Sequence, residues 1–329
     1  MTTWIDTSIM ARHGVAKARA GRHHTLTEAE QGRYCYVYGA YADPVLEIEP
    51  GDTITVETLD AFGGAIKTEH DLPSKVLTPP YVNPQNGPIL VKGAEPGDTL
   101  AVHISSVTPR GPQPRGTTCL IPEFGGLTGT ANTAMLTDPL PETVRKVHVD
   151  ESGIVWSDKI TLPYEPFIGT IGVAPRLEAI SSLQPDYYGG NMDLPDVAPN
   201  TIIYFGVNHP GAYLHLGDCH AAQGDGELCG VAIEQPTTTT LQVDLIKGRA
   251  LSWPRIESET MVMSVGSARP LEDATRIAYR DLIHWMVADY GFETLEAYML
   301  LTQCGRVRLG NLVDPKYTVG ASVAKSIIA

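Results

Sequence analysis

The sequence predicts a mainly β protein, in which a jelly-roll-like or barrel-like β body carries an α/β portion at its C-terminal end. Three observations predict this fold class. The 329 residues include 32 Gly and 25 Pro, which favours many turns and short strands. Alternating apolar and polar residues recur before residue 240, whereas a long helical period appears only after it. We therefore expect a β-rich body over residues 1–240 and an α/β portion over residues 241–329 packed on it.

Two stretches in the first part of the chain repeat one pattern. "LEIEPGDTITV" (46–56) and "GAEPGDTLAV" (93–102) both place E-P-G-D-T among alternating residues. Pro-Gly-Asp is a turn sequence, so each stretch predicts two strands joined as a hairpin. We expect a sandwich or barrel built from two related units, although EPGDT as a good turn explains the pattern equally well.

The middle of the chain alternates between loops and short strands. Residues 110–150 are rich in Pro, Gly and Thr, and we expect a long connection there. The apolar stretches "TIIYFGV" (201–207) and "AYLHLGD" (212–218) predict strands separated by a turn at "NHPG".

Two helices are expected near the C-terminal end. Ala274, Ala278 and Leu282 follow a helical period, and Gly291 should end that helix. "TLEAYMLLTQC" (294–304) predicts a second helix, and "ETMVMSVG" (259–266) predicts a strand before both.

Composition argues against several classes of partner. The net charge is −14, with no basic stripe, which argues against binding to nucleic acid or to anionic membranes. No apolar stretch has the 18 or so residues that a membrane span needs, and the first residues lack the apolar core of a signal peptide. The five cysteines form no C-x-x-C motif, so we expect free thiols and a cytoplasmic protein.

The stretch "LHLGDCHAAQGDGELCGVAIE" (214–234) has an unusual density of polar residues. If a strand covers its first part, Asp218 and His220 share one face. We expect "ELCGVAIE" (227–234) to resume as a strand that ends at Glu234. Converging Asp, His and Glu side chains suit a divalent metal, and they suit a general acid–base pair equally well.

Ordinary structural roles explain some of these residues individually. Asp225-Gly226 is typical of a hairpin tip, and a single His220 in a strand is often just a hydrogen-bonded residue. Cys219 neighbours His220 along a strand and therefore points to the other face, so we expect a packed residue rather than a nucleophile. The density of the cluster favours a functional site.

Two further stretches carry candidate residues. In "YYGGNMDLPD" (187–196), a tight turn at Asn191 would present Asp193, although an Asx-capped loop explains it as well. In "VETLDAFGGAI" (56–66), Glu57 lies near the end of a strand, where exposed polar residues are common.

These motifs resemble the acetamidase/formamidase family. "GGNMD" (189–193) followed by "GDCHAAQGDGELCGVAIE" (217–234) is similar to that family's G-G-N-x-D and G-D-x-H-A-x-Q-G-D-G-E patterns, and the likeness runs roughly from Asp43 to Lys325. The resemblance implies hydrolysis of small amides such as formamide or acetamide to a carboxylate and ammonia. It also implies a bound divalent metal, with zinc as the expected ion, and a homo-oligomer.

The resemblance carries over to specific polar positions. They are Asn191, Asp193, Asp218, His220, Gln223, Asp225, Glu227 and Glu234. The chain departs from the family at "GVNHPGAYLHLGD" (206–218), which brings in His209 and His215, and over residues 110–150.

We expect these positions to divide into metal ligands and catalytic groups. Asp193 and His220 would hold the ion, with Glu234 or Glu57 as a third ligand and Asp218 beside them. Glu227 would be the general base. Its carboxylate would pass a proton to the amide nitrogen, because ammonia leaves only after that nitrogen has gained a proton.

The remaining positions would form the rest of the catalytic group. Gln223 and Asn191 would orient the substrate amide by hydrogen bonds, and Asp225 would belong to the same catalytic group. Two alternatives stay open: a hydrolase of cyclic amides (lactams), and a non-catalytic β-sandwich in which the same cluster fixes a small ligand or a structural ion.

Overall fold

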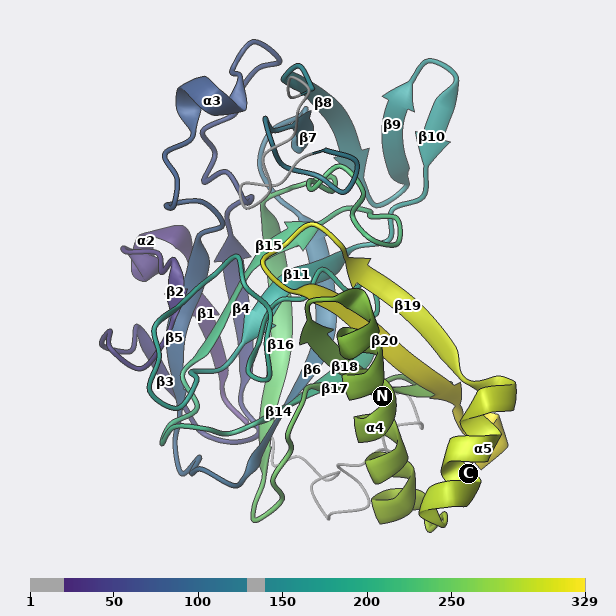
Figure 1. Ribbon diagram of the computed structural model, residues 1–329. Coiled ribbons are helices and arrows are strands. Elements are labelled where there is room, and N and C mark those ends of the chain that lie inside the picture. The colour runs from purple at the N-terminus through teal and green to yellow at the C-terminus, as the bar shows by residue number, and fades with distance from the viewer. Residues whose placement is uncertain (1–20, 129–139, 329) are drawn as a thin grey trace.

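The computed structural model describes residues 21–128 and 140–328 and arranges most of them in three layers. A five-stranded sheet packs on one face of a nine-stranded sheet, and two helices cover part of the other face (Figure 1). The expected mainly β class with helices near the C-terminal end is confirmed.

The nine-stranded sheet is antiparallel except for one pair at its edge. Its first two strands are parallel, and every other neighbour pair is antiparallel. In spatial order, the strands are β1 (His23–Leu26), β4 (Thr53–Thr58), β16 (Thr237–Ile246), β6 (Thr99–Pro109), β14 (Thr201–Gly206), β17 (Arg255–Glu257), β18 (Met261–Ala268), β20 (Tyr317–Ala324) and β19 (Arg306–Asn311).

The five-stranded sheet carries most of the polar cluster. Its spatial order is β13 (Gly189–Asn191), β11 (Phe167–Gly172), β15 (Leu214–His220), β5 (Gln85–Val91) and β3 (Leu46–Ile48). Two smaller sheets complete the β structure. They consist of β10 (Ile160–Leu162), β9 (Gly153–Ser157), β8 (Thr143–Asp150) and β7 (Gly116–Leu120), and of β12 (Ile180–Ser181) with β2 (Val37–Tyr38).

Strand β14 shows why the central layer is apolar on both faces. Ile203 and Phe205 belong to the core between the two large sheets, whereas Ile202 and Tyr204 belong to the core under the helices. Successive side chains of a strand point to opposite faces, so a strand buried on both sides needs a continuous apolar run. The stretch "TIIYFG" is such a run.

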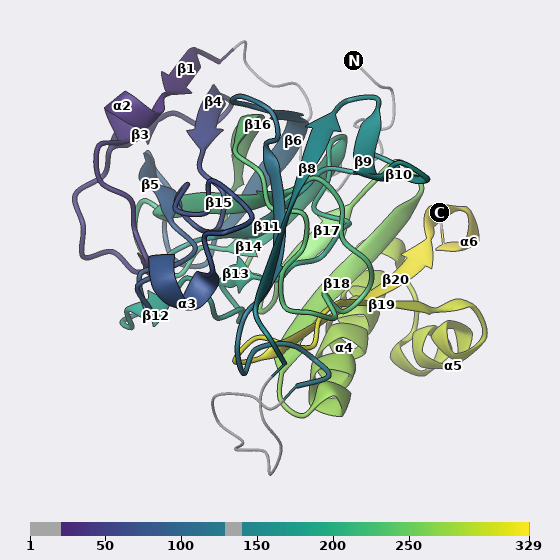
Figure 2. The same ribbon diagram turned by 90° about the horizontal axis from the view of Figure 1, so that it is seen from above.

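The two expected helices are confirmed. They are α4 (Leu271–Tyr290) and α5 (Thr294–Cys304), and Gly291 ends the first in a left-handed conformation with φ of 73°. Figure 2 shows α4 lying along β18 and β20, with α5 outside it. The other helices within the described residues are single turns: α2 (Glu28–Gln31), α3 (Pro73–Val76) and α6 (Lys325–Ile328).

The two EPGDT turns are not hairpins, and this expectation was wrong. The first connects β3 to β4 and the second connects β5 to β6, so each joins the five-stranded sheet to the nine-stranded sheet. The turns are alike: Asp52 accepts a hydrogen bond from the Glu49 backbone N–H, and Asp98 accepts one from the Glu95 N–H. Alternation predicted the strands, but their partners come from distant parts of the chain.

Two local expectations also need correction. The long connection expected over residues 110–150 contains β7 and β8, which pair antiparallel, while residues 129–139 lie outside the described part of the chain. The stretch 227–234 is not a strand, because Glu227, Gly226 and Gly230 all have positive φ and turn the backbone. Within this stretch, Glu234 forms isolated β-bridges, and these do not extend into a strand.

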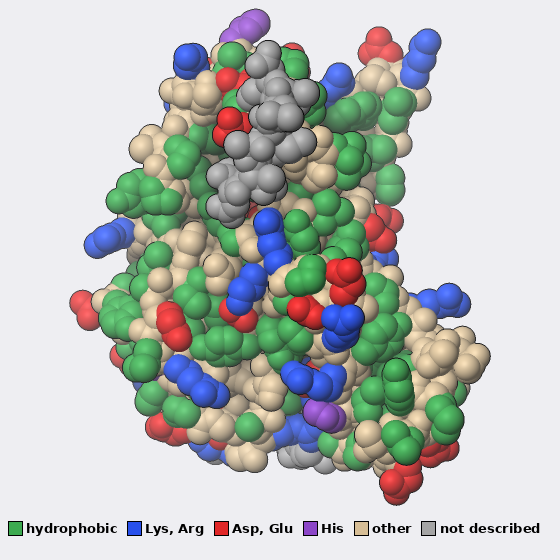
Figure 3. All heavy atoms as spheres, in the orientation of Figure 1, with side chains coloured by type: hydrophobic (Ala, Val, Ile, Leu, Met, Phe, Trp, Pro, Cys, Tyr) green, Lys and Arg blue, Asp and Glu red, His purple; other side chains and the backbone are tan. Residues whose placement is uncertain are grey.

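The boundary expected near residue 240 lies within β16, and the nine-stranded sheet continues across it. The division into a body and a C-terminal portion stays a prediction. Among the described residues, no helix combines the length and apolar character needed to cross a bilayer. On the face shown in Figure 3, acidic and basic side chains intermingle.

His215, one of the departures from the family pattern, predicts a pH dependence of stability. It is buried in β15, and its Nδ1 lies 3.0 Å from the Tyr213 carbonyl oxygen. Burial lowers the pKa of His215 to about 4, below the value of about 6.5 expected in the unfolded chain. Between these values the unfolded chain binds a proton that the folded chain does not, so stability is lost as pH falls through this range.

We therefore expect the free energy of unfolding to fall between pH 7 and pH 5 by about 2 kcal/mol from this residue alone. Urea titrations of the wild type and of His215→Gln at both pH values measure it. The variant should show a shallower pH dependence, and His23→Gln at an exposed position should follow the wild type. Equal slopes for the wild type and His215→Gln would show that His215 does not contribute.

Candidate active site

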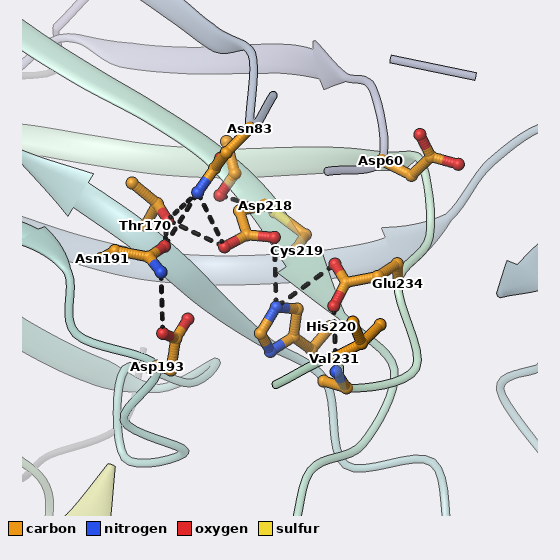
Figure 4. Close-up of polar contacts among 12 residues, drawn as sticks. Asp60, Asn83, Thr170, Asn191, Asp193, Asp218, Cys219, His220, Val231 and Glu234 are labelled. Carbon is orange, nitrogen blue, oxygen red and sulfur yellow. Dashed lines mark hydrogen bonds and ion pairs between the residues drawn. The ribbon is translucent and has the colours of Figure 1, made fainter. Parts of the chain in front are cut away.

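Polar side chains gather where β13 and β15 end. Asp218 and His220 lie at the end of β15, while Asn191 ends β13 and Asp193 follows it. All of them are buried, and Figure 4 shows them facing one another. Strand alternation predicted that Asp218 and His220 share one face, and their side chains are in direct contact.

His220 lies between two carboxylates. Its Nε2 is 3.2 Å from Asp218 Oδ1 and 3.3 Å from Glu234 Oε2, with all three side chains almost completely buried (Figure 4). Burial opposes a charge on the ring, but the Glu234 and Asp218 carboxylates outweigh it and raise the pKa of His220 well above its ordinary value. The two carboxylates therefore favour the protonated form of this imidazole.

Gln223 fixes the orientation of this imidazole. Its Nε2 donates to the carbonyl oxygens of Asp193 (2.8 Å) and Gly310 (2.9 Å), which turns its Oε1 toward His220 Nδ1 at 3.0 Å. Nδ1 therefore donates its hydrogen to the amide oxygen, and Nε2 faces the carboxylates.

A second network holds Asp218 from the other side. The Asn83 amide nitrogen donates to Thr170 Oγ1 (3.0 Å), Asn191 Oδ1 (2.8 Å) and Asp218 Oδ2 (3.2 Å). The Thr170 hydroxyl donates to Asp218 Oδ2 at 2.8 Å. These donors satisfy the carboxylate oxygen that does not face the imidazole.

Residues at the end of β19 and just after it border the site on the side of the nine-stranded sheet. Asn191 Nδ2 donates to Asp193 Oδ2 (2.9 Å) and to Asp314 Oδ2 (2.7 Å). Asn311 Nδ2 donates to Asp193 Oδ2 at 3.3 Å. The backbone of Gly226 pairs with Leu309 and Leu312, which places the segment containing Glu227 at the same point.

Burial raises the pKa of most acids in this site. It raises that of Glu234 to about 8 and that of Asp314 to about 7. Burial and neighbouring carboxylates raise the pKa values of Asp193 and Glu227 well above the ordinary range. Asp218 differs: burial favours its neutral form, but His220 outweighs this and lowers its pKa.

Two overlapping groups could hold a divalent ion, and both include His220. They are Asp193–His220–Glu227 and Asp218–His220–Glu234, with ligand atoms within 4.8 Å of one another in each. Because Gln223 occupies Nδ1, the nitrogen that remains for an ion is Nε2, which faces Asp218 and Glu234. A ligating histidine ordinarily donates its other N–H to an oxygen in this way.

The residues present fit such an ion. One nitrogen and two carboxylate ligands suit zinc. A Cβ at Gly169 would lie only 2.8 Å from both Asp193 Oδ1 and His220 Cε1, so glycine keeps this space open. Within the described part of the chain, the buried Asp193 Oδ1 accepts no hydrogen bond, so it is free to accept one from a bound molecule.

The structure brings together seven of the nine residues that the sequence predicts for the site. They are Asn191, Asp193, Asp218, His220, Gln223, Glu227 and Glu234. Asp225 is exposed at the rim and pairs with Arg308 at 3.3 Å. Glu57 is not in this cluster: its Oε2 accepts a hydrogen bond from the Glu28 N–H at the start of α2, at 3.0 Å.

Sequence reasoning missed several members of the site. They are Asn83, Gly169, Thr170, Asn311 and Asp314. Thr170 could have been recognised from the sequence, because its hydroxyl lies inside the apolar run "FIGTIG", where a buried polar group needs a hydrogen-bond partner. Asp314 could have been recognised too, because it lies in "GNLVDP", within a stretch that already resembles the family.

Comparison with known proteins agrees with this fold. The crystal structure of acetamidase from Yersinia enterocolitica is 57% identical in sequence, with a TM-score of 0.97 over 99% of each chain. The acetamidase of Mycolicibacterium smegmatis is 29% identical over 259 residues, covering 61% of this chain and 63% of the relative. The formamidase of Methylophilus methylotrophus is 29% identical over 257 residues, covering 61% of each.

The matches thus span less than two thirds of the length of these two curated relatives. The family model for the Acetamidase/Formamidase family matches residues 37–185 and 177–327, which together include every residue of the site. The resemblance seen in the sequence is confirmed, and the chain belongs to the acetamidase/formamidase family.

Proposed function

We propose that the chain hydrolyses small linear amides to a carboxylate and ammonia, with a divalent ion held by Asp218, His220 and Glu234. The observation that carries the proposal is the position of His220 Nε2 between two buried carboxylates. The names of the related acetamidases and formamidase support the reaction. Oxygen and nitrogen ligands and the family resemblance favour zinc.

A divalent ion bound here would polarise the amide carbonyl and make a nearby water easier to deprotonate. The residues around it must then move protons. Burial raises the pKa of Glu227 well above its ordinary value, which makes its carboxylate a stronger proton acceptor than an exposed one. Glu227 takes a proton from the attacking water and returns it to the amide nitrogen, so that the C–N bond breaks and ammonia leaves.

Asp193 is suited to hold the amide nitrogen. Its Oδ2 accepts hydrogen bonds from Asn191 and Asn311, whereas its Oδ1 is buried and accepts none within the described residues. An N–H of the substrate amide can donate to Oδ1. Asn191 and Gln223 already use their amide groups on neighbouring residues, so we assign them to positioning rather than to direct contact with the substrate.

The substitution His220→Ala should remove bound metal and activity together. It deletes the nitrogen ligand and removes the hydrogen-bonding partner that lies between the buried Asp218 and Glu234 side chains. Elemental analysis of the purified variant and an ammonia-release assay with acetamide measure both losses. Wild-type protein that contains no metal and keeps full activity in a strong chelator would contradict the metal proposal and leave a direct carboxylate mechanism.

The substitution Glu227→Gln should stop turnover but keep metal and fold. It removes the proton acceptor without changing the size of the side chain, and we expect kcat to fall by about 10²- to 10⁴-fold. Metal content and thermal unfolding should match the wild type. A variant with near wild-type kcat would exclude Glu227 as the general base.

The substitution Gln223→Ala tests the positioning of His220. Loss of the partner of Nδ1 should weaken metal affinity by about 10- to 100-fold. A competition titration against a metal-binding dye measures this change. The matched control is Gln242→Ala on β16, whose amide contacts the Gly51 carbonyl oxygen and should leave affinity unchanged. Equal affinities of both variants and the wild type would refute the role of Gln223.

A further inference from the structure

A large apolar hollow lies beside the candidate active site. Its volume is about 790 Å³, and six of its apolar lining residues are Leu120, Ile121, Phe124, Trp156, Leu162 and Ile233. An apolar hollow of this volume is typical of binding sites for small organic molecules, whose volumes are roughly 300–1,000 Å³.

The hollow and the acidic cluster share a wall. Glu227 lines the hollow, and its carboxylate also lies within 4.8 Å of the ligand atoms of His220 and Asp193. Gln223 lines the hollow while its amide oxygen contacts His220. The residue proposed as the general base is therefore part of the wall of the hollow.

Part of the lining comes from residues 110–150, which depart from the family pattern, and the rest comes from residues 156–165 and 222–233. Leu120 ends β7, Trp156 lies in β9 and Leu162 ends β10, while Phe124 follows β7. The Phe124 ring lies against Gly230, where a Cβ would come within 2.5 Å of the ring. Gly230 thus makes room for this ring in the wall of the hollow.

Formamide and acetamide leave such a hollow almost unused. Formamide has no carbon beyond its carbonyl, and acetamide adds one methyl group, whereas the space accommodates a chain or ring of many atoms. Because the proposed reaction releases ammonia, the amide nitrogen carries no substituent. An apolar group that fills the hollow must therefore be on the acyl side.

We propose that the preferred substrates are primary amides with a medium-length aliphatic or aryl-substituted acyl group, which lies in this hollow while the amide reaches Glu227. The inference rests on the proposed amide hydrolysis. It deepens that proposal by naming the class of acyl group.

An ammonia-release assay over a graded series tests it. The series contains formamide, acetamide, butyramide, hexanamide and phenylacetamide, with the metal-loaded full chain. We expect kcat/KM to rise about fourfold for each added CH₂ group up to hexanamide, because each is transferred from water to an apolar site. A flat or falling series would overturn the inference. So would faster opening of ε-caprolactam than hydrolysis of hexanamide, with the lactam reaction followed by the 6-aminohexanoate formed, because it releases no ammonia.

Substitutions in the wall give a second readout. Phe124→Ala and, independently, Leu162→Ala should lower kcat/KM for hexanamide and phenylacetamide by about tenfold and leave acetamide within about twofold. The matched control, Leu295→Ala, removes an apolar side chain that is 73% exposed on α5 and should change nothing. Equal losses for acetamide and hexanamide in both wall variants would contradict a role for the hollow in binding the acyl group.

The outcomes separate the two proposals. If no amide in the series releases ammonia, the proposed function itself fails. If acetamide is hydrolysed and the longer amides are not, the proposed function stands and the acyl-group inference fails.

Discussion

The contact of His220 Nε2 with Asp218 and Glu234 is the interaction on which the surrounding structure depends. Five carboxyl groups are buried around this single imidazole, and burying charges is unfavourable unless they are paired and hydrogen-bonded. Three side-chain amides provide hydrogen bonds within this cluster. Gln223 orients the ring, Asn83 binds the outer oxygen of Asp218, and Asn191 links two further carboxylates. An ion between the carboxylates would relieve the remaining repulsion.

The fold brings these groups together from distant parts of the chain. β13 and β15 of the five-stranded sheet supply Asn191, Asp218 and His220, while the end of β19 brings Asn311 from the edge of the nine-stranded sheet. The site therefore depends on how the two sheets pack. The EPGDT turns, which carry the chain from one sheet to the other, serve that packing.

Much of the site could be predicted from the sequence where it depends on local rules. Strand alternation placed Asp218 and His220 on one face, and the family pattern added Glu227 and Glu234. The same rule wrongly predicted a strand over residues 227–234. Glu227 has a positive φ, a backbone conformation that the alternation of apolar and polar residues does not reveal. Glu57 was misplaced and Asn83 and Asp314 were missed because their partners are set by tertiary packing.

The most direct test of the account is calorimetric titration of Zn²⁺ into chelator-treated protein at pH 6, in two buffers with different ionisation enthalpies. The two buffers give the number of protons released. We predict one ion bound per chain with proton release, because an ion at Nε2 must displace the proton that Asp218 and Glu234 stabilise there. Absence of saturable binding, or binding that His220→Ala leaves unchanged, would contradict the central claim.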